Sequence, residues 1–307
     1  MPSLRLGHGV HIPAGLDAAD AFAAGLDAWA AVLPASAVFS SLTAARAHGL
    51  WLPPLPERTP WFVVMGRENG ESVPVRPELH VTRPVRTTAS EDGRLTTVPE
   101  TLLACARDCA LLDVVVLVDS ALHLGLTDVQ TVLATAKPRA KGSSRLREAV
   151  ALSDARSESP WETLLRVLHT TAGIDTVPQQ DLFDADGRFV GRADLLVVGT
   201  RTLHEYDGPD HRTLAGQRRD LGRDRRLLGA GYVRRGFTAQ DVIRHPHNII
   251  REACESLGTP FTMEQIFPWL ALVEQSLFSA SGQRQALNRW LRSEVVGKNA
   301  KALRALG

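Results

Sequence analysis

Two apolar stretches separated by three residues constrain this chain more than any other feature. The first stretch, 192–198, reads RADLLVV, and the second, 202–208, reads TLHEYDG. Gly199 and Thr200 follow the first stretch, and glycine in the first central position is typical of a tight hairpin turn. The sequence therefore predicts two antiparallel strands joined by a two-residue loop.

This hairpin brings acidic side chains together. With a two-residue loop, Val198 pairs with Arg201, and the same register places Asp194 opposite Glu205. Paired residues on one face have Cβ atoms about 4.5–5.5 Å apart, and like charges there destabilise a sheet unless something neutralises them. Because side chains alternate along a strand, Asp207 projects to the same face as Glu205. We therefore expect three carboxylates in one small volume, with a divalent cation as the neutralising charge.

Carboxylate oxygens are hard ligands, which suit Mg²⁺ or Mn²⁺ rather than zinc. Such an ion polarises a phosphoryl oxygen and makes a bound water nucleophilic at neutral pH. The acids therefore indicate phosphodiester hydrolysis. A structural interpretation stays open, in which Arg192 and Arg201 simply balance the hairpin carboxylates.

Two further residues are candidates for the same chemistry. Glu162 lies three residues after Ser159, which is the spacing of a capping box at a helix N-terminus. The same helix could also direct Glu162 toward the carboxylates, and both interpretations stay open. His211 could donate or accept a proton during strand scission, or it could be a solvated loop residue.

The arginines are concentrated in one segment. Residues 212–235 contain eight arginines and no lysine. Arg219, Arg223 and Arg226 recur at spacings of four and three, which places them along one helical stripe. Such a stripe can bind successive phosphates through bidentate hydrogen bonds, although a charged helix face is often only solvated.

Composition limits the class of protein. The length of 307 residues allows two domains, and a net charge of +1 says nothing by itself about partners. Three cysteines argue against a disulfide framework and fit a reducing cytosol. Cys105 and Cys109 lie in an apolar helical run, so packing is favoured over zinc binding. No signal peptide is visible and no apolar run could cross a bilayer, so we expect a cytoplasmic protein without a membrane partner.

The secondary-structure pattern divides the chain into four parts. The second half has the order helix, three strands, helix, strand, helix, which predicts an α/β domain with a central mixed sheet flanked by helices. The first part is predicted to be α+β and mostly helical. The expected boundaries are residues 1–137 for a winged-helix-like N-terminal domain, 138–153 for a linker and bridging helix, 154–257 for the α/β domain and 258–307 for a helical extension.

An ordered set of motifs in the α/β domain resembles a known family. The motifs are Ser159-Pro160-x-Glu162-Thr163-x-Leu165-Arg166, Arg192-x-Asp194-Leu195, Glu205-Tyr206-Asp207-Gly208-x-x-His211 and Arg219-Asp220 followed by Arg226-x-Leu228-x-x-Gly231-Tyr232. Over about one hundred residues, Ser153–Ser256, they resemble the PD-(D/E)xK nuclease domains related to very-short-patch repair endonucleases, whose fold is restriction-endonuclease-like.

The resemblance implies a role for each matched residue. Asp194 would be the motif aspartate that binds the metal, Glu205 the following acidic ligand, Glu162 the acidic residue on the first helix and His211 an accessory catalytic residue. The metal ligands expected are thus Glu162, Asp194 and Glu205. Contacts with DNA phosphates are expected from Arg192, Arg212, Arg219, Arg223 and Arg226. One departure is that the superfamily carries lysine two residues after the second acid, where this chain has Asp207.

The N-terminal part carries a shorter pattern. Ser41-x-Thr43-Ala44-Ala45 followed by Gly49-Leu50-Trp51-Leu52-Pro53 is similar to the start of AbiEi-type antitoxin or regulator-like proteins, in which a winged-helix-like module precedes such a nuclease domain. The resemblance implies DNA contact, yet no basic recognition helix stands out, so partner binding or packing are the other roles considered.

The sequence therefore predicts a DNA endonuclease or nickase that depends on Mg²⁺ or Mn²⁺ and acts in DNA repair or in defence against foreign DNA. The alternative is a non-catalytic DNA-binding regulator or antitoxin with a degenerate nuclease domain. Glycoside hydrolysis by paired carboxylates is a third hypothesis, but it does not explain the arginine-rich helix. A protein partner, or a homodimer formed through the N-terminal domain or the C-terminal helices, is left open.

Overall fold

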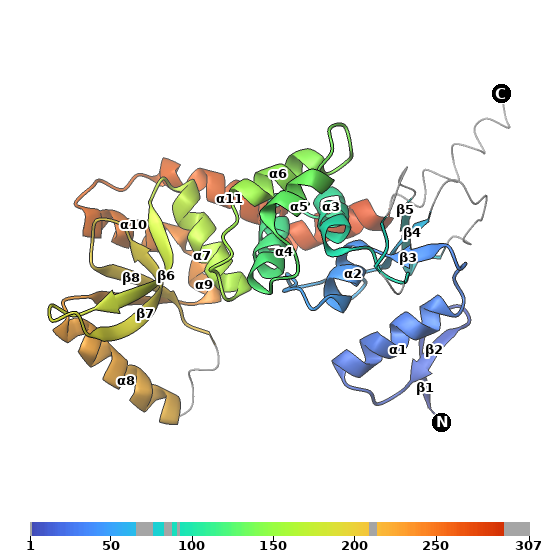
Figure 1. The fold of residues 1–307 in the computed structure, drawn as a ribbon, viewed down its shortest axis with the longest axis horizontal. Coiled ribbons are helices and arrows are strands. Elements are labelled where there is room, and N and C mark those ends of the chain that lie inside the picture. The colour runs from blue at the N-terminus through green and yellow to red at the C-terminus, as the bar shows by residue number, and fades with distance from the viewer. Residues whose placement is uncertain (1, 66–75, 83–87, 91–92, 209–213, 292–307) are drawn as a thin grey trace.

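The computed structural model describes residues 2–65, 76–82, 88–90, 93–208 and 214–291, with the backbone alone for 214–221. The molecule is elongated, with strands at both ends and a layer of helices between them (Figure 1). The fold is α/β with mixed sheets, because each of the larger sheets contains both parallel and antiparallel neighbours.

The N-terminal end combines a strand hairpin, two helices and a three-stranded sheet. Its elements are β1 (Ser3–Gly7), β2 (Val10–Pro13), α1 (Ala18–Ala30), β3 (Ala37–Phe39), α2 (Ser41–Ala47), β4 (Trp61–Met65) and β5 (Leu79–Thr82). Strand β4 lies between β3, which is antiparallel to it, and β5, which is parallel. Trp29 of α1 is fully buried and packs with Phe39, Met65 and Leu79 in one apolar cluster.

The central layer is helical. It contains α3 (Val98–Asp108), α4 (Leu111–His123), α5 (Val129–Thr135) and α6 (Ser143–Ala151). The residues of α4 from Leu112 to Ala121 are all buried, which explains why most of this segment is apolar. Among the described residues, no helix is both long and apolar enough to cross a membrane.

The end of the molecule opposite to β1–β5 holds a four-stranded mixed sheet. Its elements are α7 (Pro160–Thr171), β6 (Thr176–Phe183), β7 (Phe189–Val197), β8 (Thr202–Tyr206), α8 (Leu214–Gly229), β9 (Val233–Phe237) and α9 (Ala239–Arg244). The strand order is β6-β7-β8-β9, antiparallel except for the parallel pair β8 and β9. Helix α8 contacts one face of the sheet and α7 lies on the other side (Figure 1). The predicted mixed sheet flanked by helices is confirmed.

The predicted register between β7 and β8 is confirmed, whereas the predicted two-residue loop is wrong. Leu195 lies opposite His204, which is the register that sets Asp194 against Glu205. The turn, however, closes with a hydrogen bond of 3.2 Å from the Thr200 N–H to the Val197 carbonyl. Its glycine, Gly199, has a φ of +80° and therefore adopts the left-handed conformation that glycine favours.

The loop is longer because both predicted closing residues bond elsewhere. The N–H of Val198 donates to the Asp175 carbonyl at 3.0 Å, and the Arg201 carbonyl accepts the N–H of Val233 at 2.9 Å. These bonds tie the hairpin to the segment before β6 and to β9. Tertiary contacts therefore set the loop, while the alternation of side chains still sets the register.

The last part of the described chain returns to the first half of the molecule. It contains α10 (Pro246–Leu257), the 3-10 helix η2 (Met263–Ile266), α11 (Phe267–Gln275) and the helical residues 280–291. Ser276 and Leu277 both donate to the buried carboxylate of Asp113, at 2.5 and 2.9 Å. The indole N–H of Trp290 donates to the Asp108 carbonyl at 3.0 Å.

One apolar cluster runs through the helical layer and crosses the boundaries expected from the sequence. It joins side chains from α2 to the helical residues 280–291, among them Leu42, Leu117, Leu146, Leu164, Leu195, Ile250, Trp269 and Trp290. The segments 1–137, 138–153, 154–257 and 258–291 thus share a core.

A buried ion pair links the central helices to α7. Arg166 donates to Asp119 of α4 at 2.6 Å, and Asp119 is 0% exposed. Thr163 and the backbone N–H of Asp154 bond to the same carboxylate, at 2.8 Å each. Burial raises the pKa of Asp119 above its ordinary value, although the charge of Arg166 and these hydrogen bonds oppose the increase.

We predict that Arg166→Met lowers the free energy of unfolding by about 3–5 kcal/mol, because it leaves the Asp119 carboxylate buried without its counter-ion. The matched control is Arg156→Met, which breaks an ion pair with Asp154 on a side chain that is 55% exposed and should cost less than about 1 kcal/mol. Urea unfolding of both variants measures the difference. Equal losses of unfolding free energy would show that the buried pair contributes no more to stability than the exposed pair does.

Candidate active site

The candidate site lies where β7 and β8 stop pairing. Their pairing ends at Leu195, one residue after Asp194 in the sequence. The N–H of Asp207 donates to Phe237 of β9 at 2.9 Å. Because N–H groups alternate along a strand, the N–H of Tyr206 points toward β7 instead. There the carboxylate of Asp194 accepts it at 2.9 Å, so a side chain takes the place of the next backbone partner.

Two other acids, Glu162 and Glu205, act electrostatically on Asp194. Its pKa is raised to about 7, first by burial and then by the negative charges of Glu162 and Glu205. The N–H of Tyr206 and the charge of Arg223 oppose the increase. The acids whose charges act on Asp194 are therefore Glu162 and Glu205, rather than Glu205 and Asp207 as expected.

Glu162 serves both of the roles that the sequence left open. Ser159 caps α7, and its hydroxyl donates to Oε1 of Glu162 at 2.9 Å. The N–H of Glu158 donates to Oε2 at 2.8 Å, as does the side-chain amide of Gln179. Glu162 thus takes part in capping α7, although its carboxylate accepts the N–H of Glu158 rather than the Ser159 N–H of a reciprocal capping box. These three donors hold the carboxylate in place, and its charge acts on Asp194.

Gln179 belongs to the site although no motif in the sequence includes it. The register of β6 and β7 pairs Pro178 with Leu195 and Gln180 with Ala193, so Gln179 lies opposite Asp194. Its φ is +51°, a left-handed conformation in the middle of a strand. Backbone strain of this kind costs about 1–3 kcal/mol and clusters at functional sites. An uncharged residue in a strand gives no signal of such a role in the sequence.

Two arginines neutralise Glu205. This carboxylate is 3% exposed and lies on the face that α8 covers. Arg223 of α8 donates to both of its oxygens, at 2.6 and 2.9 Å. Arg234 of β9 donates from Nε to Oε2 at 2.5 Å. Leu227, one turn after Arg223, is buried against the sheet and so turns this side of α8 toward Glu205.

Asp207 faces an arginine rather than the other acids of the cluster. Its carboxylate accepts a hydrogen bond of 2.5 Å from Nη2 of Arg234. A Cβ atom on Gly236 would lie 1.9 Å from this carboxylate, so the glycine leaves the room that Asp207 occupies. Burial acts to lower the pKa of Arg234, but its bond to Glu205 and the nearby acids raise the pKa above its ordinary value. Glu205 and Asp207 do share a face, but they meet at Arg234.

The remaining predicted residues lie in different places. Arg192 pairs with Glu158 at 2.6 Å, and Arg226 is exposed on α8. Arg219 lies on α8 within the part described by its backbone alone. His211 and Arg212 lie outside the described residues. Arg201, the other arginine considered as a neutralising charge, donates to the Ala230 carbonyl at 2.6 Å.

The opposite face of β8 carries a neutral histidine pair. His169 contacts the Leu165 carbonyl through Nδ1 at 2.7 Å, and its Nε2 lies 2.9 Å from Nδ1 of His204. Burial lowers the pKa of His169 to about 4 and that of His204 to about 2. Both rings are therefore neutral near pH 7.

The donor set suits a hard cation only in part. Asp194 and Glu162 crowd each other without a direct guanidinium partner among the described residues, and a cation would relieve their repulsion. Glu205, by contrast, already accepts three hydrogen bonds from arginine. Within the described part of the chain, no three His, Cys, Asp or Glu side chains form a ready metal-binding group. Glu205 therefore fits a cation only when a guanidinium gives way.

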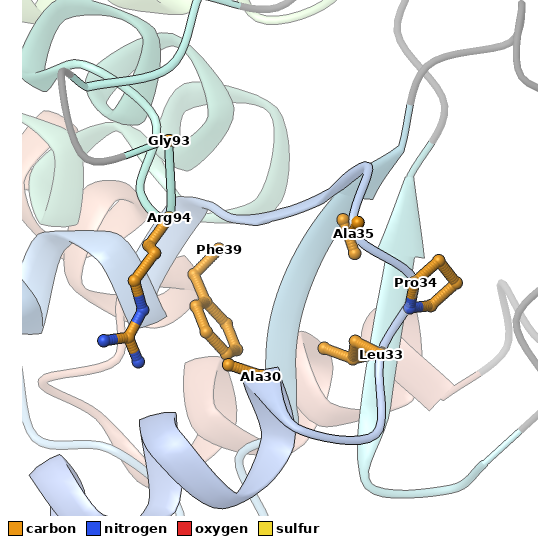
Figure 2. A pocket seen from close by; sticks show the side chains of 8 residues that line it. Ala30, Leu33, Pro34, Ala35, Phe39, Gly93 and Arg94 are labelled. Carbon is orange, nitrogen blue, oxygen red and sulfur yellow. The ribbon is translucent and has the colours of Figure 1, made fainter.

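A cavity elsewhere in the molecule does not involve these acids. It has a volume of about 300 Å³ and lies at the N-terminal end, between the end of α1, β3 and the segment at Arg94 (Figure 2). Its lining is mainly apolar and includes Leu33, Pro34 and Phe39. Arg94 at its edge pairs with Asp27 at 2.7 Å.

Comparison with known proteins returned no match to this chain among family models, curated proteins or solved structures. The assignment of the site therefore depends on its geometry and on the motif resemblance.

We predict that Gln179→Gly is more stable than Gln179→Ala by about 1 kcal/mol, because both variants lose the amide while only glycine adopts a positive φ without strain. Urea unfolding of the two proteins gives the difference directly. Equal stability would mean that residue 179 does not keep its left-handed conformation in solution.

We predict that Asp194→Asn stabilises the protein increasingly as the pH rises. Folding raises the pKa of Asp194, so the folded protein binds an extra proton between about pH 4 and 7. The stability that this proton contributes is fully present below about pH 4 and is lost as the pH rises through 7. The stability of the asparagine variant does not change in this way, because asparagine stays neutral. Without divalent cations, the advantage of the variant should grow by roughly 3–4 kcal/mol between pH 4 and 8. A constant difference in urea unfolding would exclude the crowding.

Proposed function

We propose that the protein is a metal-dependent nuclease that nicks or cuts DNA by hydrolysing phosphodiester bonds. The observation that supports this most is the position of Asp194 where β7 and β8 separate, because burial and the negative charges of Glu162 and Glu205 together raise its pKa to about 7. Crowded carboxylates are costly, and a bound cation is one way to make them tolerable.

The fold supports the same proposal. The matched motifs lie on or next to α7, β7, β8 and α8. Strands β7 and β8 belong to one mixed sheet, and helices lie on both of its faces. A mixed sheet flanked by helices is compatible with the PD-(D/E)xK domains that the motifs resemble. The four motifs, which are scattered over about one hundred residues of sequence, would then serve one site.

In this proposal, the side chains divide the work. Asp194 and Glu162 hold Mg²⁺ or Mn²⁺, and Glu205 joins them when its arginine partner is displaced. When bound, such a cation polarises the phosphoryl oxygen and lowers the pKa of a water molecule. The amide of Gln179 and the hydroxyl of Ser159 hold the Glu162 carboxylate in position. Arg219, Arg223 and Arg226 of α8 bind the phosphate backbone of the DNA.

One observation favours a second function. Arg223 and Arg234 neutralise Glu205, and Asp207 stands where the superfamily carries lysine. A domain of this kind could bind DNA as a regulator or antitoxin without cleaving it. This second candidate predicts DNA binding without a cation, and no thermal stabilisation by Mg²⁺ or Mn²⁺. A formed metal site should instead raise the melting temperature as the cation concentration increases.

We predict that the wild-type protein converts supercoiled plasmid DNA to nicked or linear forms with Mn²⁺ or Mg²⁺. Asp194→Ala should lower the rate by about 100-fold or more, because several kcal/mol of transition-state stabilisation would be lost with the cation. Quantified gel bands over time measure the rate.

The matched control is Asp186→Ala, which removes an exposed acid between β6 and β7 and should leave cleavage unchanged. Circular dichroism should show that both variants are folded. Undiminished cleavage by Asp194→Ala would remove this aspartate from the site. The absence of cleavage by wild-type protein with any divalent cation, together with DNA binding, would favour the non-catalytic function.

A further inference from the structure

The two guanidinium partners of Glu205 are held in different ways. Arg234 extends from β9, bonds to Glu205 and Asp207 at 2.5 Å each and lies 3.8 Å from Asp224, so three acids contact it. Arg223 extends from α8 and has Glu205 as its acidic hydrogen-bond partner, with a further bond to the carbonyl of Arg192. Arg223 is thus held by fewer charged contacts.

Arg223 is also the arginine that a ligand at α8 would reach. Its side chain is 29% exposed, while the Glu205 carboxylate behind it is 3% exposed. Arg225 and Arg226, which follow it on the same helix, are exposed. A guanidinium fork matches a phosphate as well as it matches a carboxylate, because both accept two parallel N–H donors.

Removing Arg223 from Glu205 would change the balance of charge at the site. Its positive charge acts on Asp194 and partly offsets the effect of the neighbouring acids. Without it, Arg234 would be the remaining counter-ion of Glu205, and the charges of Glu162 and Glu205 would both still act on Asp194. Such a cluster would attract a divalent cation more strongly than the arginine-paired cluster does.

We propose that Arg223 couples phosphate binding to cation binding. Its guanidinium exchanges the Glu205 carboxylate for a phosphate oxyanion, and the freed carboxylate then joins Asp194 and Glu162 as a cation ligand. Arg223 is a positioning residue in this scheme, and Arg234 stays with Glu205 and Asp207. The proposal rests on the proposed function and extends it, because it makes the cation site depend on the presence of the phosphate.

The test measures Mn²⁺ affinity rather than cleavage. Free Mn²⁺ is followed by electron paramagnetic resonance in phosphate-free buffer, with the full-length wild type and with Arg223→Met and Arg225→Met. Arg223→Met should bind Mn²⁺ about 5–150-fold more tightly than wild type, which is the usual range of coupling between two sites. Arg225→Met, which removes an exposed arginine from the same helix, should bind as wild type does.

The second arm adds the phosphate. A short phosphorothioate DNA duplex, which resists hydrolysis, should tighten Mn²⁺ binding by wild type but not by Arg223→Met. A methylphosphonate duplex, which lacks charged oxygens, should have no effect. Inorganic phosphate distinguishes the sources: a gain with phosphate and duplex indicates recognition of the oxyanion alone, and a gain with the duplex only indicates recognition of the DNA backbone. Both results support the coupling.

Arg223→Lys serves as the second variant if Arg223→Met does not fold, because it keeps the positive charge but loses the fork. Its Mn²⁺ affinity should exceed that of wild type, and its response to the duplex should be weaker. Equal Mn²⁺ affinity in wild type and the folded Arg223 variant would overturn the coupling, as would an equal gain from the duplex in both.

The outcomes separate this proposal from the nuclease function. Tight Mn²⁺ binding by wild type without phosphate, together with DNA cleavage, would reject the coupling and keep the nuclease. Coupled binding without cleavage would keep the coupling and reject the nuclease. The absence of Mn²⁺ binding in every variant, with or without the duplex, would reject both.

Discussion

The neutralisation of buried carboxylates by arginine is the constraint on which the rest of this structure depends. Glu205 on β8 and Asp119 on α4 are both almost fully buried, and each bonds to a guanidinium from another element. Because an unpaired charge in such a place is strongly destabilising, each pair fixes the position of the element that supplies the arginine. Arg223 and Arg234 thus tie α8 and β9 to β8, and Arg166 ties α7 to the helical layer.

The helical layer explains how the acidic site is held. Helix α7 supplies Glu162 at its N-terminus and Arg166 one turn later, so the helix that carries an acid of the site is anchored to α4 by the buried pair. The residues after α10 complete this layer, since Ser276 and Trp290 bond to the ends of α4 and α3. The apolar core therefore packs against α7 and β7, which carry acids of the site, and continues through the helical layer to α2.

Asp194 differs from the other acids of the sheet. Glu205 and Asp207 each have an arginine, whereas Asp194 bonds to a backbone N–H and feels two neighbouring carboxylates. This difference concentrates the electrostatic cost at one residue. The two proposed functions differ in what becomes of this electrostatic cost. In a catalytic site a bound cation would relieve it, whereas in a non-catalytic DNA-binding domain it would remain.

The sequence by itself determined the local structure of the C-terminal half. Alternation of side chains set the register that opposes Asp194 to Glu205, and the spacing from Ser159 to Glu162 set the start of α7. These features depend on neighbours in the sequence, so their signals are local. The short strands β1, β2 and β3 are not among the elements that the sequence pattern predicts.

Only the tertiary structure decided which charges meet. The parallel pairing of β8 with β9 places Arg234 beside Glu205, and this register follows from a crossover through α8 rather than from a turn. The hairpin loop was likewise set by bonds to Asp175 and Val233, and Gln179 entered the site because β6 places it opposite Asp194. Local periodicity determines which face of the sheet a side chain lies on. The partner of that side chain depends on packing between distant segments. For that reason the opposition of Asp194 and Glu205 was predictable, and the arginines that pair with Glu205 were not.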